Sequence, residues 1–91
     1  MYSTLKGQVN EGNLSDALES FNRISFEGNQ RAIANDPDVI NGLLGHLKDP
    51  NKIVAVKQWL ERITPLLEGN VVMKGVAEKA KEIIERGDAA P

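Results

Sequence analysis

His46 is the one imidazole in this 91-residue chain, and imidazole is the side chain best suited to moving protons near neutral pH. General acid–base catalysis would also need a partner that positions the ring. No carboxylate or nucleophile stands at a spacing that supplies one, so we interpret His46 as a partly exposed structural residue. The chain has no cysteine, which excludes disulfides, thiol nucleophiles and cysteine-bound zinc. We therefore expect a protein that is not an enzyme.

The carboxylates of Asp36 and Asp38 are the next candidates, as an acid pair or as metal ligands. The spacing of a calcium loop fails, because Ile40 stands where the third oxygen ligand belongs. Asp followed by Pro37 is typical of a helix start, where a carboxylate accepts hydrogen bonds from free N–H groups. The sequence thus predicts no metal site, and it contains no phosphate-loop or other cofactor motif.

Apolar residues recur at helical spacing along the whole chain, and no stretch alternates long enough to indicate a strand. We expect Asn13, Asp36, Asp49 and Asn70 to cap helices. The expected elements are a weak helix at 3–11, helices at 13–24 and 36–48, short turns at 29–35, a helix from Asp49-Pro50 to Thr64-Pro65, a turn at Leu66-Leu67, and a last helix from Asn70 to Gly87. This pattern predicts an all-α compact bundle of five to six short amphipathic helices, or a short stack of helical hairpins.

The composition is 41% apolar and 26% charged, which is typical of a soluble globular domain. We expect residues 1–87 to form a single helical domain and residues 88–91 to be a flexible tail or the start of a linker. No apolar run approaches the roughly 20 residues that cross a bilayer. The N-terminal residues lack the basic and apolar stretches of a signal peptide, so we expect a cytoplasmic protein.

Aromatic residues make up only 4% of the chain, so the few large rings carry much of the interpretation. Phe26 is expected to anchor the core in the break after the second helix. Trp59 falls on an apolar stripe, which favours the core, although Trp is also enriched at binding hot spots. Val54 and Ala55 make the same helix apolar on a second side, which indicates burial within the bundle or against a partner.

Gly42 and Gly45 lie opposite the leucine stripe of their helix. They are interpreted first as tolerated surface glycines, and second as a place where another backbone approaches closely. The candidate protein interface therefore comprises Trp59, Val54, Lys57, Gly42, Gly45 and His46.

The formal net charge is −2, with −3 over residues 1–50 and +1 over residues 51–91. Neither half has the basic excess of a general nucleic-acid binder, so the sequence argues against nucleic acid and against a membrane as partners. The alternative function remains a small helical nucleic-acid-binding protein. It would use the basic residues of the C-terminal half, namely Lys52, Lys57, Arg62, Lys74, Lys79, Lys81 and Arg86.

Residues Asp38 to Ile63 read DVINGLLGHLKDPNKIVAVKQWLERI. This segment resembles a HEAT- or armadillo-type helical hairpin through its Leu-Leu-x-x-Leu, its Asp-Pro turn and its aliphatic second helix. Gly12 to Ile24 resembles the first helix of a TPR-like hairpin. These resemblances imply that such hairpins bind other proteins. We expect a non-enzymatic protein–protein interaction module, such as an adaptor, an inhibitor or an N-terminal association domain, whose partner is another protein or a second copy.

Overall fold

Helices account for most of residues 2–87, the part of the chain that the computed structural model describes. The elements in order are α1 (Tyr2–Glu11), α2 (Leu14–Asn22), α3 (Glu27–Ala34), α4 (Pro37–Leu44), α5 (Ile53–Ile63), the 3-10 helix η1 (Thr64–Leu67) and α6 (Val71–Glu85). Within this range there is no strand, which confirms the predicted all-α bundle. The expected tail at 88–91 lies outside the described residues.

Two of the four predicted caps are present as hydrogen bonds. Asp36 Oδ1 accepts from the Asp38 backbone N–H at 2.9 Å and starts α4, while Asn70 Oδ1 accepts from the Met73 N–H at 3.2 Å and starts α6. Asn13 does precede α2, but its side chain caps no N–H group, so that prediction is wrong in its chemistry.

The predicted helix start at Asp49-Pro50 is wrong, and so is the end of the helix before it. α4 stops at Leu44, and the N–H groups of His46, Leu47 and Asp49 bond to carbonyls three residues back, which tightens the chain into turns. Asp49 Oδ1 accepts from the Asn51 N–H at 2.9 Å, and Lys52 Nζ donates to Asp49 Oδ2 at 3.0 Å. The Lys52 N–H bonds to the Asp49 carbonyl three residues back at 2.9 Å, so residues 49–52 close a turn. α5 therefore begins only at Ile53.

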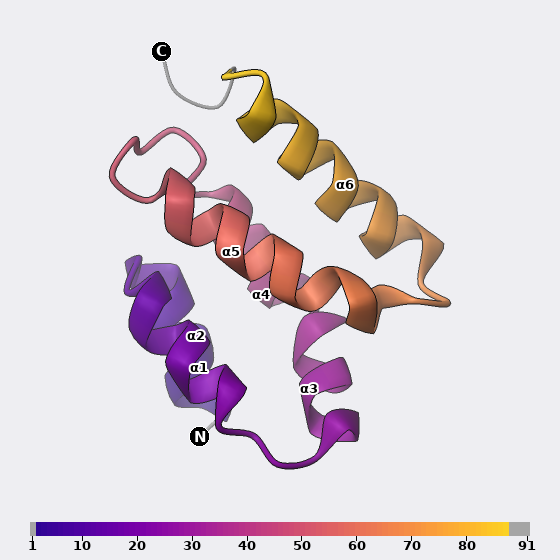
Figure 1. The fold of residues 1–91 in the computed structure, drawn as a ribbon. Helices are drawn as coiled ribbons and strands as arrows, with labels where there is room; N and C mark the ends of the chain where they lie inside the picture. The colour runs from indigo at the N-terminus through magenta and orange to yellow at the C-terminus, as the bar shows by residue number, and fades with distance from the viewer. Residues whose placement is uncertain (1, 88–91) are drawn as a thin grey trace.

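The helices lie in two groups that share one core (Figure 1). α1 packs against α2 and α4, and the longest pair, α5 and α6, runs antiparallel through the bend at η1 (Figure 1). α4 contacts α1, α3, α5 and α6, so it links the N-terminal helices to the C-terminal pair. No helix among residues 2–87 is both long enough and apolar enough to span a bilayer.

The core is aliphatic around two aromatic rings, as the low aromatic content predicts. Phe21 and Trp59 are fully buried, with ring centroids 5.2 Å apart at a tilt of 52°. Tilted aromatic pairs at this separation add favourable contact beyond their area. The other buried side chains come from all the helices and η1, namely Leu5, Val9, Leu14, Ala17, Ile33, Ala34, Val39, Ile40, Leu43, Val56, Leu60, Ile63, Leu66, Leu67, Met73, Ala77 and Ala80.

Two large apolar side chains, Phe26 and Val72, lie on the surface. Phe26 is 73% exposed, because residues 24–26 cross the surface as a connection and Phe26 itself has an extended backbone at the start of α3. Val72 is 74% exposed, because the buried stripe of α6 is centred on Met73, Ala77 and Ala80, to one side of Val72. The expectation that Phe26 anchors the core is therefore wrong.

Candidate functional site

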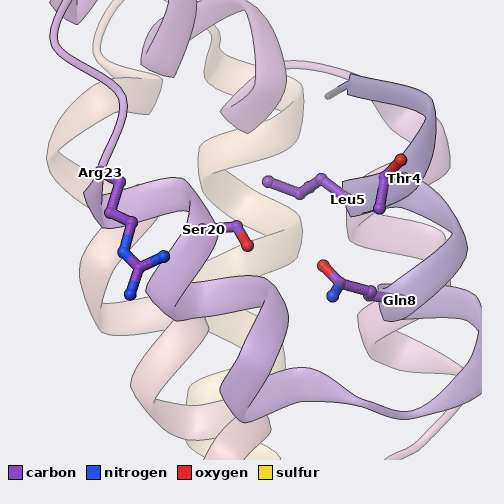
Figure 2. Close-up of a pocket in the computed structure, with 5 residues that line it drawn as sticks. All are labelled: Thr4, Leu5, Gln8, Ser20 and Arg23. Carbon is purple, nitrogen blue, oxygen red and sulfur yellow. The ribbon is translucent and has the colours of Figure 1, made fainter.

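A pocket of about 250 Å³ lies between α1 and α2. Leu5 and Gln8 of α1 point towards Ser20 of α2, and Arg23 lies at the C-terminal end of α2 (Figure 2). Thr4 completes the lining. The guanidinium of Arg23 is ion-paired with Glu19 at 2.5 Å, in an exposed pair one helical turn apart.

The chemistry of this pocket is limited to hydrogen bonding. Gln8 Oε1 is buried and accepts no hydrogen bond from another protein group. The two hydroxyls, from Thr4 and Ser20, have no general base among the lining residues, and the Arg23 guanidinium can only donate hydrogen bonds. The α1–α2 pocket can therefore hold a small polar group, but its lining supplies neither an acid nor a base.

A second cavity, of about 230 Å³, is a groove between the end of α4 and the second half of α6. We call it the α4–α6 groove, and its lining residues are Leu44, Leu47, Val76, Lys79, Ala80 and Ile83. Its lining surface is entirely apolar carbon, and Lys79 is the one charged residue among the residues that line it. A concave apolar surface with a single charged group is typical of a site that binds an apolar side chain.

The groove follows directly from the residue sizes on the two helices. Val76, Ala80 and Ile83 repeat at the i, i+4, i+7 spacing that places them on one face of α6. Ala80 is buried and small, so it forms a floor that the larger side chains beside it do not fill. Leu44 and Leu47 form the opposite wall and remain only partly buried.

Trp59, the first residue of the expected interface, lies in the core. It is fully buried, and its indole Nε1 donates to the Leu14 carbonyl at 2.9 Å. The core interpretation therefore holds, and the ring is not accessible to a partner.

Gly42 and His46 also make contacts within the chain. A Cβ atom at position 42 would lie 2.8 Å from Val9 Cγ1, which agrees with the second interpretation of this glycine, a close approach by another backbone, and not with the first; the approaching backbone is that of α1. His46 Nε2 donates to the Val9 carbonyl at 2.8 Å, which gives the half-buried imidazole the structural role that we expected.

The three other interface residues are accessible but lie on separate segments. Val54 is 68% exposed and Lys57 is half-buried, both on α5. Gly45 is exposed at the end of α4, and the Gly45–His46 pair lies between the two leucines that wall the α4–α6 groove. Sequence reasoning thus reached the edge of the groove but missed the residues on α6. The available signal was Lys79, a charged residue set among Val76, Ala80 and Ile83.

The basic residues of the C-terminal half do not all project freely. Lys52 is paired with Asp49 at 3.0 Å, and Arg86 is paired with Glu82 at 3.3 Å. Arg62 Nε donates to Asn22 Oδ1 at 2.8 Å, and its guanidinium lies 5.2 Å above the centroid of the Phe21 ring. These contacts reduce the positive charge available to a phosphate backbone.

The carboxylates of Asp36 and Asp38 are bound by a lysine. Lys6 Nζ lies 3.1 Å from Asp36 Oδ2 and 3.0 Å from Asp38 Oδ2. The hydrogen bond to Asp38, followed by that to Asp36, raises the pKa of Lys6 above 10.5. Among residues 2–87, no cluster of three or more His, Asp or Glu side chains has the arrangement of a metal site.

Comparisons with protein-family models, with curated proteins and with solved structures give no match for this chain. The resemblance of residues 38–63 to a HEAT-type hairpin therefore stays a prediction, and the functional assignment depends on the geometry of the two cavities.

Proposed function

We propose that this protein is a non-enzymatic protein–protein interaction module and that the α4–α6 groove receives part of its partner. The observation that carries this proposal is the apolar lining of the groove, which leaves the partly buried Leu44, Leu47 and Val76 at its edges. Covering such a surface removes apolar carbon from water, which is the main favourable contribution to protein association.

The groove selects a partner by shape and by charge. Its volume of about 230 Å³ suits a large apolar side chain rather than a polar one, because nothing but Lys79 can pair with a buried polar group there. The Lys79 ammonium favours an acidic group next to that side chain. The partner class is therefore a protein segment with a large apolar residue beside a carboxylate.

The α1–α2 pocket supports this function less. Its mostly apolar lining also carries hydroxyl, amide and guanidinium groups, and a partner would have to match each one that it buries, because an unmatched buried polar group costs about 1–3 kcal/mol. Val54 and Lys57 on α5 form a separate candidate contact that lies outside both cavities.

Affinity capture from an extract of the native host, with the full chain immobilised, tests the proposal. Leu47→Asp places a charge in the groove wall, and Val54→Asp places the same charge on the exposed surface of α5. We expect a protein that is retained by the unmodified chain and by Val54→Asp but is lost with Leu47→Asp.

Circular dichroism of each variant must show the helical spectrum, so that a loss of binding is not a loss of folding. Retention by Leu47→Asp together with loss by Val54→Asp would move the interface to α5. Equal retention by both variants would contradict a role for the groove.

A further inference from the structure

Phe26 is an aromatic side chain that stands largely in water. It is 73% exposed, and its backbone is extended, with φ −97° and ψ 122°, so the ring projects from a surface connection and not from a packed helix face. Glu27 follows it directly at the first position of α3, is exposed as well, and pairs one turn along the helix with the exposed Arg31 at 3.4 Å. Phe26 and Glu27 together present a large apolar side chain beside a carboxylate.

The α4–α6 groove has the complementary features, an apolar cavity and a cationic residue. The groove has apolar walls from Leu44, Leu47 and Ile83, and Lys79 is the charged residue among those that line it. Insertion of Phe26 would cover apolar carbon on both sides, and Glu27 would exchange its exposed pair with Arg31 for one with Lys79. The complementarity thus includes both hydrophobicity and the sign of the charge.

Phe26 cannot occupy the groove of its own chain. The connection between α2 and α3 lies at one edge of the molecule, whereas the turn after α4 and the second half of α6 lie at the opposite edge (Figure 1). Any Phe26 in the groove must therefore come from a second molecule.

We propose that the protein associates with itself, and that Phe26 of one copy inserts into the α4–α6 groove of the next while Glu27 pairs with Lys79. This inference rests on the proposed function and names a second copy of the chain as the partner. The two surfaces are different patches, so each copy has one of each left free, and the association runs head to tail into rings or open chains. One aromatic side chain and one exposed ion pair support a Kd on the order of 1 mM, so the association is concentration-dependent.

The contact can be located with a paramagnetic label, because the chain has no cysteine and a single introduced thiol is unique. A spin label is attached at Ser25→Cys in unlabelled protein, which is mixed at millimolar concentration with ¹⁵N-labelled unmodified chain. We expect broadening of the amide signals of residues 44–47 and 76–83 in the ¹⁵N-labelled copy. Broadening elsewhere only, or none, would overturn the proposal.

A charge exchange tests the pairing. The association is followed through the changes in amide chemical shift that accompany a rise in protein concentration. Glu27→Lys and Lys79→Glu are each expected to raise the Kd of association at least threefold, since like charges then face each other. The double variant carries both changes and restores the opposite charges in reversed order. We expect it to regain the association of the unmodified chain, and a double variant no better than the single ones would contradict the contact.

Phe26→Ala is expected to abolish the association, with Val54→Ala as the matched control at another exposed apolar residue. If the Val54→Ala variant loses association and Phe26→Ala keeps it, the proposed contact is wrong. A chain that stays monomeric at millimolar concentration, yet loses a captured protein with Leu47→Asp, would overturn self-association while leaving the proposed function in place. A Leu47→Asp variant that keeps both the self-association and the captured protein would overturn the self-association proposal and the proposed function together.

Discussion

Gly42 of α4 lies so close to Val9 of α1 that a Cβ atom at position 42 would stand 2.8 Å from Val9 Cγ1. The same atom would be 2.9 Å from Asn10 Oδ1. Val9 is fully buried and β-branched, so its side chain has little freedom to move away. The absence of a side chain at Gly42 is what lets the backbones of α1 and α4 approach, and His46 bonds to the Val9 carbonyl at the same junction.

Gly42→Ala is therefore expected to destabilise the protein. Alanine favours a helix by about 1 kcal/mol relative to glycine, but crowding a packed junction costs about 1–3 kcal/mol. Gly75→Ala is the matched control, since Gly75 lies within α6 with no atom near its added Cβ, and should stabilise by up to about 1 kcal/mol. Urea unfolding followed by circular dichroism measures both. Equal stabilisation by the two substitutions would contradict the close packing at Gly42.

Trp59 is expected to determine stability and not binding. The side chain is fully buried and its indole N–H bonds to the Leu14 carbonyl, so Trp59→Ala removes a large core volume and leaves that carbonyl without its partner. A loss of about 3–5 kcal/mol in unfolding free energy follows. Trp59→Phe should cost less, because it keeps part of the packing. A Trp59→Ala variant with unchanged urea midpoint would show that the ring does not lie in the core.

The fold could be predicted largely from local patterns. Helical spacing and the Asp36-Pro37 pair identify real elements because they depend on neighbours in sequence. The second Asp-Pro pair predicts a helix start that is wrong. Asp49 bonds to Asn51 and Lys52 in a turn, and the dipeptide, which is the same as at Asp36-Pro37, does not distinguish a turn from a helix start. Phe26 was misplaced because hydrophobicity alone does not say whether a connection crosses the surface or the core.

The candidate site was harder to predict, because it depends on distant segments. Leu44 ends α4 and Leu47 lies in the turn after it, whereas Val76 and Ala80 come from α6, and only the tertiary packing brings these walls together. Each half looks like an ordinary core face in the sequence. Lys79 also becomes a candidate contact only in the tertiary structure, where it is the charged residue among the apolar residues that line the groove.

The Asp49 turn predicts a specific acid sensitivity. The hydrogen bond from Lys52, followed by that from the Asn51 N–H, lowers the pKa of Asp49 below 3.8. A carboxyl with a depressed folded-state pKa contributes stability that is present above 3.8 and is lost as the pH falls through its folded-state value. The unfolding free energy of the unmodified chain should drop below pH 3.8, and Asp49→Asn should lack this part of the drop. Urea unfolding across this range checks it, and identical pH profiles would contradict the assignment.

Binding to nucleic acid is expected to be weak. Lys52 and Arg86 are paired with carboxylates, and Arg62 is held by Asn22, so the positive charge of the C-terminal half is partly neutralised within the fold. We expect no retardation of a DNA or RNA duplex at low salt. A salt-dependent shift that disappears in the Lys74→Gln/Lys81→Gln double variant would instead support the alternative function.

The same substitution should lower the unfolding free energy strongly at Phe21 and hardly at all at Phe26. Phe21 is fully buried against Trp59, so Phe21→Ala is expected to cost about 3–5 kcal/mol of unfolding free energy. Phe26 is mostly in water, so Phe26→Ala should change it by no more than about 0.5 kcal/mol. Urea unfolding at micromolar concentration, where self-association is negligible, compares the two. A large loss with Phe26→Ala under these conditions would mean that the ring stabilises the monomer. A negligible loss would mean that the exposed ring adds nothing to the folding of the monomer and is available to contact a second molecule.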